Sequence, residues 1–271
     1  MKQISKQPVL WHCETASQRK SIPVLFVHGM WGWHWYWSNF INVFASSGYE
    51  CYAIDVQGHG TAWKSPIQGN VSLGKYVEEI KSAINIISEK DRPPILIGHS
   101  MGGLLVQKAV ESIGISGIVL IASAVPKGIT VIPTFRTALI FLKYSIPALF
   151  NRAIMPDEKE VKYMVFHNVK DEELRWALER YVPESGRAFW QLITSSVSVD
   201  NSKVNCPVLV VGGGKDRVIN PRASKNLAKK YNTELLVFND NSHWLIREDG
   251  WQKICKEILE WIEQNGKSLQ Q

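Results

Sequence analysis

The sequence predicts an α/β fold in which helices cover both faces of a mostly parallel sheet. Six short runs of aliphatic residues lack polar alternation, which is typical of strands buried on both faces. Segments with helical periodicity lie between several of these runs, and such alternation favours a doubly wound sheet. Hydrophobic residues make up 45% of the 271 residues, so the chain can bury the core of one domain, or of a domain with an insertion.

The expected strands are rich in Val, Ile and Leu and end near Gly, Asp, Ser or His. They lie at residues 22–29, 49–60, 93–100, 116–124, 206–216 and 233–243. The absence of alternation within them indicates that neither face of the sheet is exposed.

Three core helices are expected. Residues 71–88 and 250–266 carry apolar side chains at spacings of three and four, and a third helix follows residue 100 and ends near Gly114. Gly266 is well placed to end the last helix. The two apolar stripes consist of Leu73, Val77, Ile80, Ile84 and Ile87, and of Trp251, Ile254, Cys255, Ile258 and Ile262.

Between residues 126 and 202 the alternation gives way to helical segments only, which predicts a cap or lid inserted between two core strands. The core is then formed by residues 1–125 and 203–271. The helical segments are residues 134–154, 157–168, 171–181 and 186–196, and the stretch is punctuated by Pro133, Pro147, Pro156 and Pro183.

The first cap helix is strongly apolar. Arg136, Lys143 and Pro147 interrupt it, so it lacks the ~18 apolar residues of a membrane span. Apolar helices are most often buried, and we expect this one to face the site. Weak contact of the cap with a membrane surface is the alternative.

Composition excludes several classes of function. The four cysteines are far apart and form no CxxC pair or metal-binding cluster with histidines, so no metal is expected and a reduced, cytoplasmic setting is the simplest interpretation. The N-terminus lacks the apolar run of a signal peptide. The net charge of +6 comes from interleaved lysines, arginines and acids, so no nucleic-acid partner is expected. The oligomeric state is left open.

The sequence Gly98-His99-Ser100-Met101-Gly102 fits the pattern G-x-S-x-G between a buried strand and a helix. The pentapeptide alone can arise by chance, but this setting predicts a nucleophile elbow. In such a turn the serine is strained and its Oγ is presented above the sheet, and glycines avoid a clash on either side.

A serine hydroxyl needs a base, and the base needs an acid that orients it. The expected chain order is Ser, then Asp or Glu, then His, on loops after later strands. Asp216 and His243 occupy such positions. Asp240 and Asp200 are the alternative acids. The backbone amides of Met30 and Met101 are the expected oxyanion donors, and His28 is expected to support the loop that carries Met30.

The motifs HGMWG, DVQGHG, GHSMGG, GGGKD and NSH, in this order, resemble those of α/β-hydrolases with a helical cap, from about Pro23 to Ile262. The resemblance is to serine esterases, lipases and lysophospholipases. It implies about eight strands, mostly parallel, with one antiparallel strand near the start. It also implies a Ser100–Asp216–His243 triad, oxyanion amides at Met30 and Met101, and no cofactor.

An apolar pocket under the cap is expected, and it favours a hydrophobic ester that forms an acyl-enzyme on Ser100. The alternatives are a thioester, amide, lactone or carbon–carbon bond with the same triad, or a catalytically silent shell that binds a ligand. The aromatic residues after position 30 could instead anchor the next helix to the sheet, as we expect of Trp37. The expected pocket residues are Trp31, Trp33, His99, Phe135, Leu139, Trp190 and Trp244.

Overall fold

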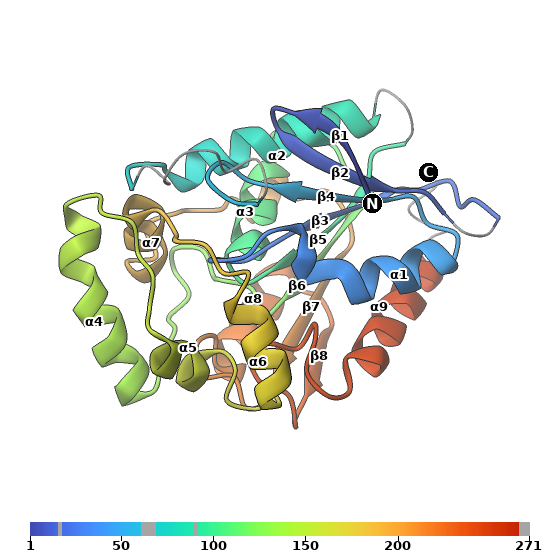
Figure 1. Ribbon diagram of the computed structural model, residues 1–271. Coiled ribbons are helices and arrows are strands. Elements are labelled where there is room, and N and C mark those ends of the chain that lie inside the picture. The colour runs from blue at the N-terminus through green and yellow to red at the C-terminus, as the bar shows by residue number, and fades with distance from the viewer. Residues whose placement is uncertain (16–17, 61–68, 89–91, 266–271) are drawn as a thin grey trace.

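A computed structural model describes residues 1–15, 18–60, 69–88 and 92–265. The strands form one eight-stranded sheet in the order β1-β2-β4-β3-β5-β6-β7-β8 (Figure 1). β2 runs against its neighbours β1 and β4, and the other pairs are parallel, so the expected single antiparallel strand near the start is confirmed. The strands are β1 (Lys2–Lys6), β2 (Val9–Cys13), β3 (Val24–Val27), β4 (Cys51–Asp55), β5 (Ile95–His99), β6 (Gly117–Ile121), β7 (Val208–Gly213) and β8 (Leu235–Phe238).

The register of the central strands brings the loops after them together. Val27 of β3 pairs with Gly98 of β5, and His99 pairs with Ile121 of β6. The six expected strand segments all contain strands, whereas the β1–β2 hairpin was expected only from the family resemblance.

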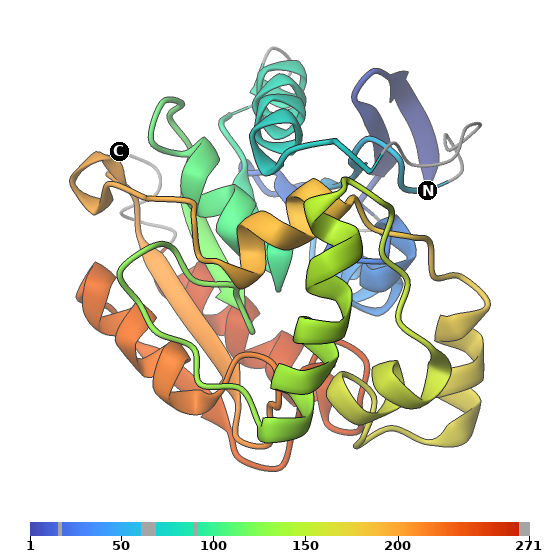
Figure 2. The ribbon, with the colours of Figure 1, turned by 90° about the vertical axis from the view of Figure 1, so that its left-hand side faces the viewer.

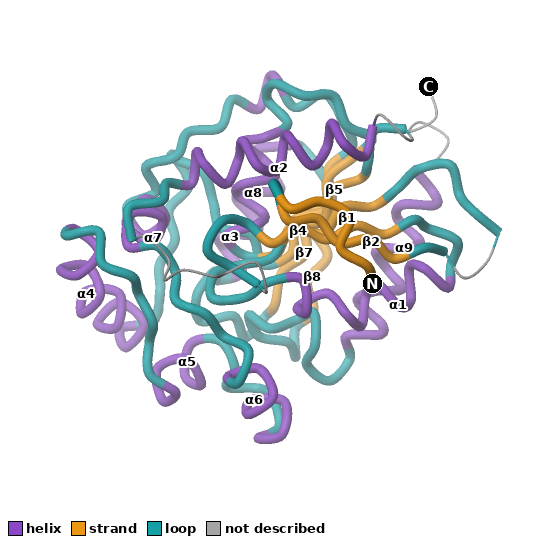
Figure 3. Tube along the Cα trace, turned by 45° about the horizontal axis from the view of Figure 1, so that its top comes forward, coloured by secondary structure: helices purple, strands orange, loops and turns teal. Residues whose placement is uncertain are grey.

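Helices pack on both faces of the sheet, as predicted (Figure 3). The 3-10 helix η1 (His34–Trp37), α1 (Ser38–Ser46) and α9 (Trp251–Asn265) lie on one face. On the other face lie α2 (Leu73–Ser88), α3 (Met101–Ala109), which ends short of Gly114, and α8 (Pro221–Tyr231). α8 has no counterpart among the predicted helices. Its start is fixed by Asn220, whose side chain accepts a hydrogen bond from the Ala223 amide at 2.9 Å, and by Pro221.

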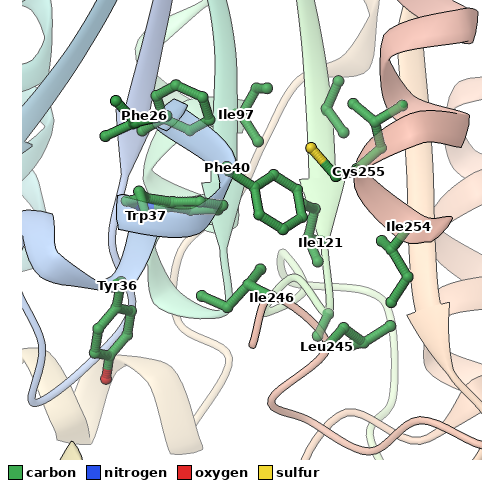
Figure 4. Packing of buried hydrophobic residues seen from close by; sticks show 14 of the residues in the cluster. Phe26, Tyr36, Trp37, Phe40, Ile97, Ile121, Leu245, Ile246, Ile254 and Cys255 are labelled. Carbon is green, nitrogen blue, oxygen red and sulfur yellow. The ribbon is translucent and has the colours of Figure 1, made fainter. Parts of the chain in front are cut away.

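The core beside α1 is built from aromatic side chains. Trp37 and Phe40 are fully buried between the sheet, α9 and the loop that contains Leu245 and Ile246 (Figure 4). The ring centroids of Trp37 and Phe26 are 5.1 Å apart. The expectation that Trp37 anchors the following helix to the sheet is therefore confirmed.

The segment between β6 and β7 contains α4 (Phe135–Leu149), α5 (Glu158–Met164), α6 (Asp171–Leu178), α7 (Gly186–Ile193) and the 3-10 helix η2 (Asn201–Lys203). Figures 1 and 2 show that α4 to α7 gather beyond the carboxyl ends of the strands. Pro147 does not end the first of these helices but lies within its last turn. Within the described ranges, no helix combines the length and apolar character needed to cross a membrane.

Candidate active site

Ser100 lies in a sharp turn between β5 and α3. Its φ of 53° and ψ of −120° place it in a strained region of backbone conformation. A Cβ on Gly98 would lie 2.6 Å from the carbonyl oxygen of Gly102, and a Cβ on Gly102 would lie 2.3 Å from that of Val27. Only glycine fits at these two positions, so the flanking residues permit the turn and Ser100 Oγ is held above the sheet.

The structure brings Ser100, His243 and Asp216 into one hydrogen-bonded row. His243 Nε2 lies 3.0 Å from Ser100 Oγ, and His243 Nδ1 lies 2.8 Å from Asp216 Oδ2. The carboxylate can only accept, so Nδ1 carries the ring proton and Nε2 is free to accept from the serine hydroxyl. All three residues are buried, which limits competition from water.

The second oxygen of Asp216 is fixed by the backbone. Asp216 Oδ1 accepts hydrogen bonds from the amides of Val218 at 2.7 Å and Ile219 at 2.9 Å. The alternative acids have other partners. Asp240 is exposed and pairs with Lys215 at 3.3 Å, and Asp200 caps η2.

The loop after β3 lies directly against the nucleophile. A Cβ on Gly29 would lie 3.0 Å from Ser100 Cβ, and Met30 and Met101 line the same cavity as Ser100. His28 Nε2 accepts from the Val56 amide at 3.3 Å, so Nδ1 donates to the Gly29 carbonyl at 2.8 Å. That carbonyl and the Met30 N–H belong to one rigid peptide plane, so His28 fixes the direction of the expected oxyanion donor.

His99 contacts the backbone of His243 and does not line the cavity. It is buried, and its Nε2 donates to the His243 carbonyl oxygen at 2.8 Å. Burial, followed by the charge of His243, lowers the pKa of His99 to about 3. His99 is therefore neutral at ordinary pH and holds the backbone of His243 in place.

Glu248 is a further buried support of the His243 loop, and sequence reasoning missed it. The Ser242 amide donates to both carboxylate oxygens of Glu248 at 2.9 Å, and Ser242 Oγ donates to Oε1 at 2.7 Å. Asn168, between α5 and α6, donates from Nδ2 to Oε2 at 2.6 Å. Burial raises the pKa of Glu248. The available sequence signal was a carboxylate shortly after His243.

Other polar contacts tie the helical segment to the core. The Trp31 indole donates to the Ile154 carbonyl at 3.1 Å, and the Trp33 indole donates to that of Arg180 at 2.8 Å. Glu184, fully buried, lies 3.1 Å from His59 Nε2 and accepts from Tyr76 OH at 2.8 Å. The indoles of Trp31 and Trp33 thus hold the segment with α4–α7 onto the core and do not line the pocket.

A cavity of about 620 Å³ opens beside Ser100. Its wall is mostly apolar and comes mainly from the loop after β6, from α4 and from the end of α7. The lining includes Met30, Met101, Val125, Lys127, Ile129, Val131, Phe141, Ile193, Thr194, Ser195 and Ile219.

None of the seven residues predicted for the pocket lines this cavity, so that prediction is corrected. Trp244 is fully buried, and its indole donates to Glu173 at 3.2 Å. Phe135 and Leu139 are 80% and 49% exposed, because α4 turns Phe141 and not these two toward the cavity. Trp190 packs beside Phe189 in a small cluster under α4. Trp31, Trp33 and His99 have the structural contacts described above.

Comparison with known proteins finds a matching family and a related sequence. Residues 18–250 match the serine aminopeptidase S33 family. Phospholipase YtpA of Bacillus subtilis (strain 168) is 24% identical over 213 residues, which cover 72% of this chain and 76% of that protein.

Solved structures share the fold. The monoacylglycerol lipase of Paleococcus ferrophilus has a TM-score of 0.70 at 22% identity, covering 93% of this chain and 98% of that chain. The methylesterase MES16 from Arabidopsis has a TM-score of 0.69 at 18% identity, covering 89% and 99%. Identities this low establish a common architecture and no more. With the family match spanning most of its length, the chain belongs to the serine aminopeptidase S33 family of α/β-hydrolases.

Proposed function

We propose that the protein is a serine hydrolase that cleaves carboxylic esters of hydrophobic acyl groups through an acyl-enzyme on Ser100. The observation that carries the proposal is the hydrogen-bonded row from Ser100 through His243 to Asp216, at 3.0 and 2.8 Å, beside an apolar cavity. A serine activated in this way is suited to attack on a carbonyl carbon.

In the first half of the reaction His243 Nε2 takes the proton of Ser100 as Oγ attacks the ester carbonyl. The negative charge that develops on the carbonyl oxygen is stabilised by the amides of Met30 and Met101, the second of which begins α3 and lies at the positive end of its dipole. The imidazolium then gives its proton to the departing alcohol oxygen, and Asp216 stabilises the charged ring.

In the second half a water molecule takes the place of the alcohol. His243 removes a proton from this water as it attacks the acyl carbon, and the tetrahedral intermediate collapses when Ser100 Oγ leaves and recovers its proton. The carboxylic acid is released and the resting state returns.

The cavity wall favours an ester over the N-terminus of a peptide. Recognition of an α-ammonium group calls for a carboxylate, and the described residues that line the cavity include Lys127 but no Asp or Glu. The volume of about 620 Å³ suits a medium-sized apolar group. The printed names of the compared proteins, a phospholipase, a monoacylglycerol lipase and a methylesterase, support the same class of bond.

The family description keeps an amide substrate as the second candidate. Hydrolysis rates on matched p-nitrophenyl esters and anilides of one acyl group separate the two, and we expect the ester to be preferred by more than the difference in chemical reactivity.

The test of the proposal is labelling with a fluorophosphonate probe, followed by p-nitrophenyl esters of increasing acyl length. We expect rapid labelling and turnover, and loss of both in Ser100→Ala with unchanged thermal unfolding. Turnover that survives in Ser100→Ala would reject the acyl-enzyme, and a wild-type protein that neither labels nor turns over any ester would favour a catalytically silent shell.

A further inference from the structure

Exposed apolar side chains are concentrated on α4 and its two flanks. Among the described residues ten large hydrophobic side chains are exposed, and eight of them lie between residues 132 and 155. We call these eight the α4 surface. They are Ile132, Phe135, Leu139, Leu142, Ile146, Leu149, Phe150 and Met155, with exposures between 40% and 80%. Contiguous apolar patches on a folded protein usually mark an interaction site.

The spacing on α4 places these side chains on one side of the helix. Residues 135, 139, 142, 146 and 149 alternate at intervals of four and three, so they form one stripe. The opposite side packs on α7 and buries Thr137, Ile140 and Ala148. α4 lies at the margin of the molecule in Figure 1, and no described element lies in front of it in Figure 2. The stripe is therefore an uncovered second apolar face.

The charged residues within this segment of chain have one sign. Residues 126–156 contain Lys127, Arg136, Lys143 and Arg152 and no Asp or Glu. Lys143 is already paired with two carboxylates, Glu160 of α5 at 2.6 Å and Asp157 at 3.7 Å. The guanidinium of Arg136 lies 4.2 Å from the Tyr163 ring centroid. Arg152 is exposed at the end of the surface. An apolar helical face flanked by cations suits the interface of a bilayer that contains anionic lipids.

A second copy of the chain fits this surface less well. Two copies paired along α4 around a two-fold axis would place Leu142, the midpoint of the stripe, near the axis. The facing segment of the other copy, residues 126–156, contains no Asp or Glu, so it would offer no carboxylate to Arg136 and Arg152. Anionic headgroups would neutralise the same cations, so the charge pattern favours lipid.

The α4 surface also borders the cavity beside Ser100. Pro133 and Phe141 belong to the same segment of chain and line that cavity. Ile132 and Phe135 are close neighbours of Pro133 in sequence and are exposed. An apolar molecule in the leaflet that contacts the docked protein would have a short path from the lipid to the cavity.

We propose that the α4 surface docks the protein on bilayers that contain anionic lipids, with α4 lying in the plane of the interface. The 15-residue helix is about 22 Å long at 1.5 Å per residue, so it lies on the membrane and does not span it. This docking goes beyond the proposed function and does not depend on which bond Ser100 attacks.

The experiment is sedimentation with vesicles of phosphatidylcholine alone and of equimolar phosphatidylcholine and phosphatidylglycerol. The full chain is used with Ser100→Ala, so that no lipid is hydrolysed and failure of the proposed chemistry leaves this test intact. We expect binding to the mixed vesicles and weaker binding to the neutral ones. Adding Phe135→Ser, Leu142→Ser and Ile146→Ser together is expected to weaken binding by at least ~100-fold, since each buried apolar side chain contributes roughly a tenfold factor.

Two matched variants control the result. Val237→Ser removes an apolar side chain of β8 that is 40% exposed outside the α4 surface, and it should leave binding unchanged. Arg152→Ser should weaken binding to mixed vesicles by about fivefold and leave binding to neutral vesicles unchanged. All these variants change exposed side chains, and unchanged thermal unfolding verifies that each one folds.

Three results would overturn the proposal. The first is a lack of binding to mixed vesicles, and the second is equal binding by the triple-serine variant. The third is a dimer in sedimentation velocity that the triple-serine substitution dissociates while vesicles bind neither protein, since the occupant would then be a second copy.

Discussion

Asp216→Asn is expected to remove most of the esterase activity without disturbing the fold. Because Asp216 Oδ1 accepts from the amides of Val218 and Ile219, the side-chain oxygen of the new asparagine must take that position. Its NH2 group then points at His243 Nδ1. A donor there forces Nδ1 to accept, and the ring proton moves to Nε2, opposite Ser100 Oγ, where no proton can be taken up.

The size of the loss follows from this change of tautomer. Loss of the correct tautomer in a serine protease triad lowers kcat by about 10⁴-fold, which at 1.36 kcal/mol for each factor of ten is roughly 5.4 kcal/mol of transition-state stabilisation. We expect a similar loss here, because both hydrogen bonds of His243 have ordinary lengths of 2.8 and 3.0 Å. Thermal unfolding should change little, since the bonds to the two backbone amides remain.

The assay is kcat for a p-nitrophenyl ester, measured together with the midpoint of thermal unfolding. Asp240→Asn is the matched control, because Asp240 precedes His243 on the same loop but is exposed and pairs with Lys215. It should keep wild-type kcat. A loss smaller than about tenfold in Asp216→Asn, or an equal loss in Asp240→Asn, would refute the assignment of the acid.

Three further predictions concern the supports and the cavity. Glu248→Ala leaves the Ser242 amide and the Asn168 amide without their buried acceptor. Chemical denaturation should therefore show a free energy of unfolding lower by about 2–5 kcal/mol, and Glu248→Gln should restore most of it. Equal losses in the two variants would contradict this account. Burial acts to lower the pKa of His59, but Glu184 outweighs it, and the folded-state pKa lies above 6.5. The stabilisation by the His59–Glu184 pair is therefore complete below pH 6.5 and is lost as the pH rises through the folded-state pKa of His59. Glu184→Gln should flatten that part of the plot of Tm against pH, and an unchanged slope would contradict a role for the pair. Ile193→Trp fills the cavity and should raise KM for long acyl esters by about tenfold or more while sparing the acetyl ester, whereas equal effects on all chain lengths would place the acyl group elsewhere.

The sequence predicted the features that depend on local pattern. Uninterrupted aliphatic runs identified six strands, and the glycines around Ser100 identified the turn, because backbone sterics demand them there. The β1–β2 hairpin escaped pattern analysis because each strand has only five residues and β1 is mostly polar and exposed.

The pocket could not be predicted because α4 is apolar on two sides. Periodicity detects an apolar face but does not tell which of two such faces is buried, so Phe135 was expected inside and Phe141 forms the wall. The indoles of Trp31 and Trp33 find their acceptors more than a hundred residues away in the chain, and no local pattern reports such a contact.

The contacts between the aromatic residues after β3 and the helices above them limit how this enzyme can be redesigned. The Trp35 and Trp176 ring centroids are 4.9 Å apart, as are those of Phe166 and Trp244. Deleting residues 126–202 would expose the aromatic rings after β3 to water and would remove the carbonyl acceptors of the Trp31 and Trp33 indoles. A chimera that borrows this segment from a relative will fold only if the graft supplies acceptors at the places now held by Ile154 and Arg180.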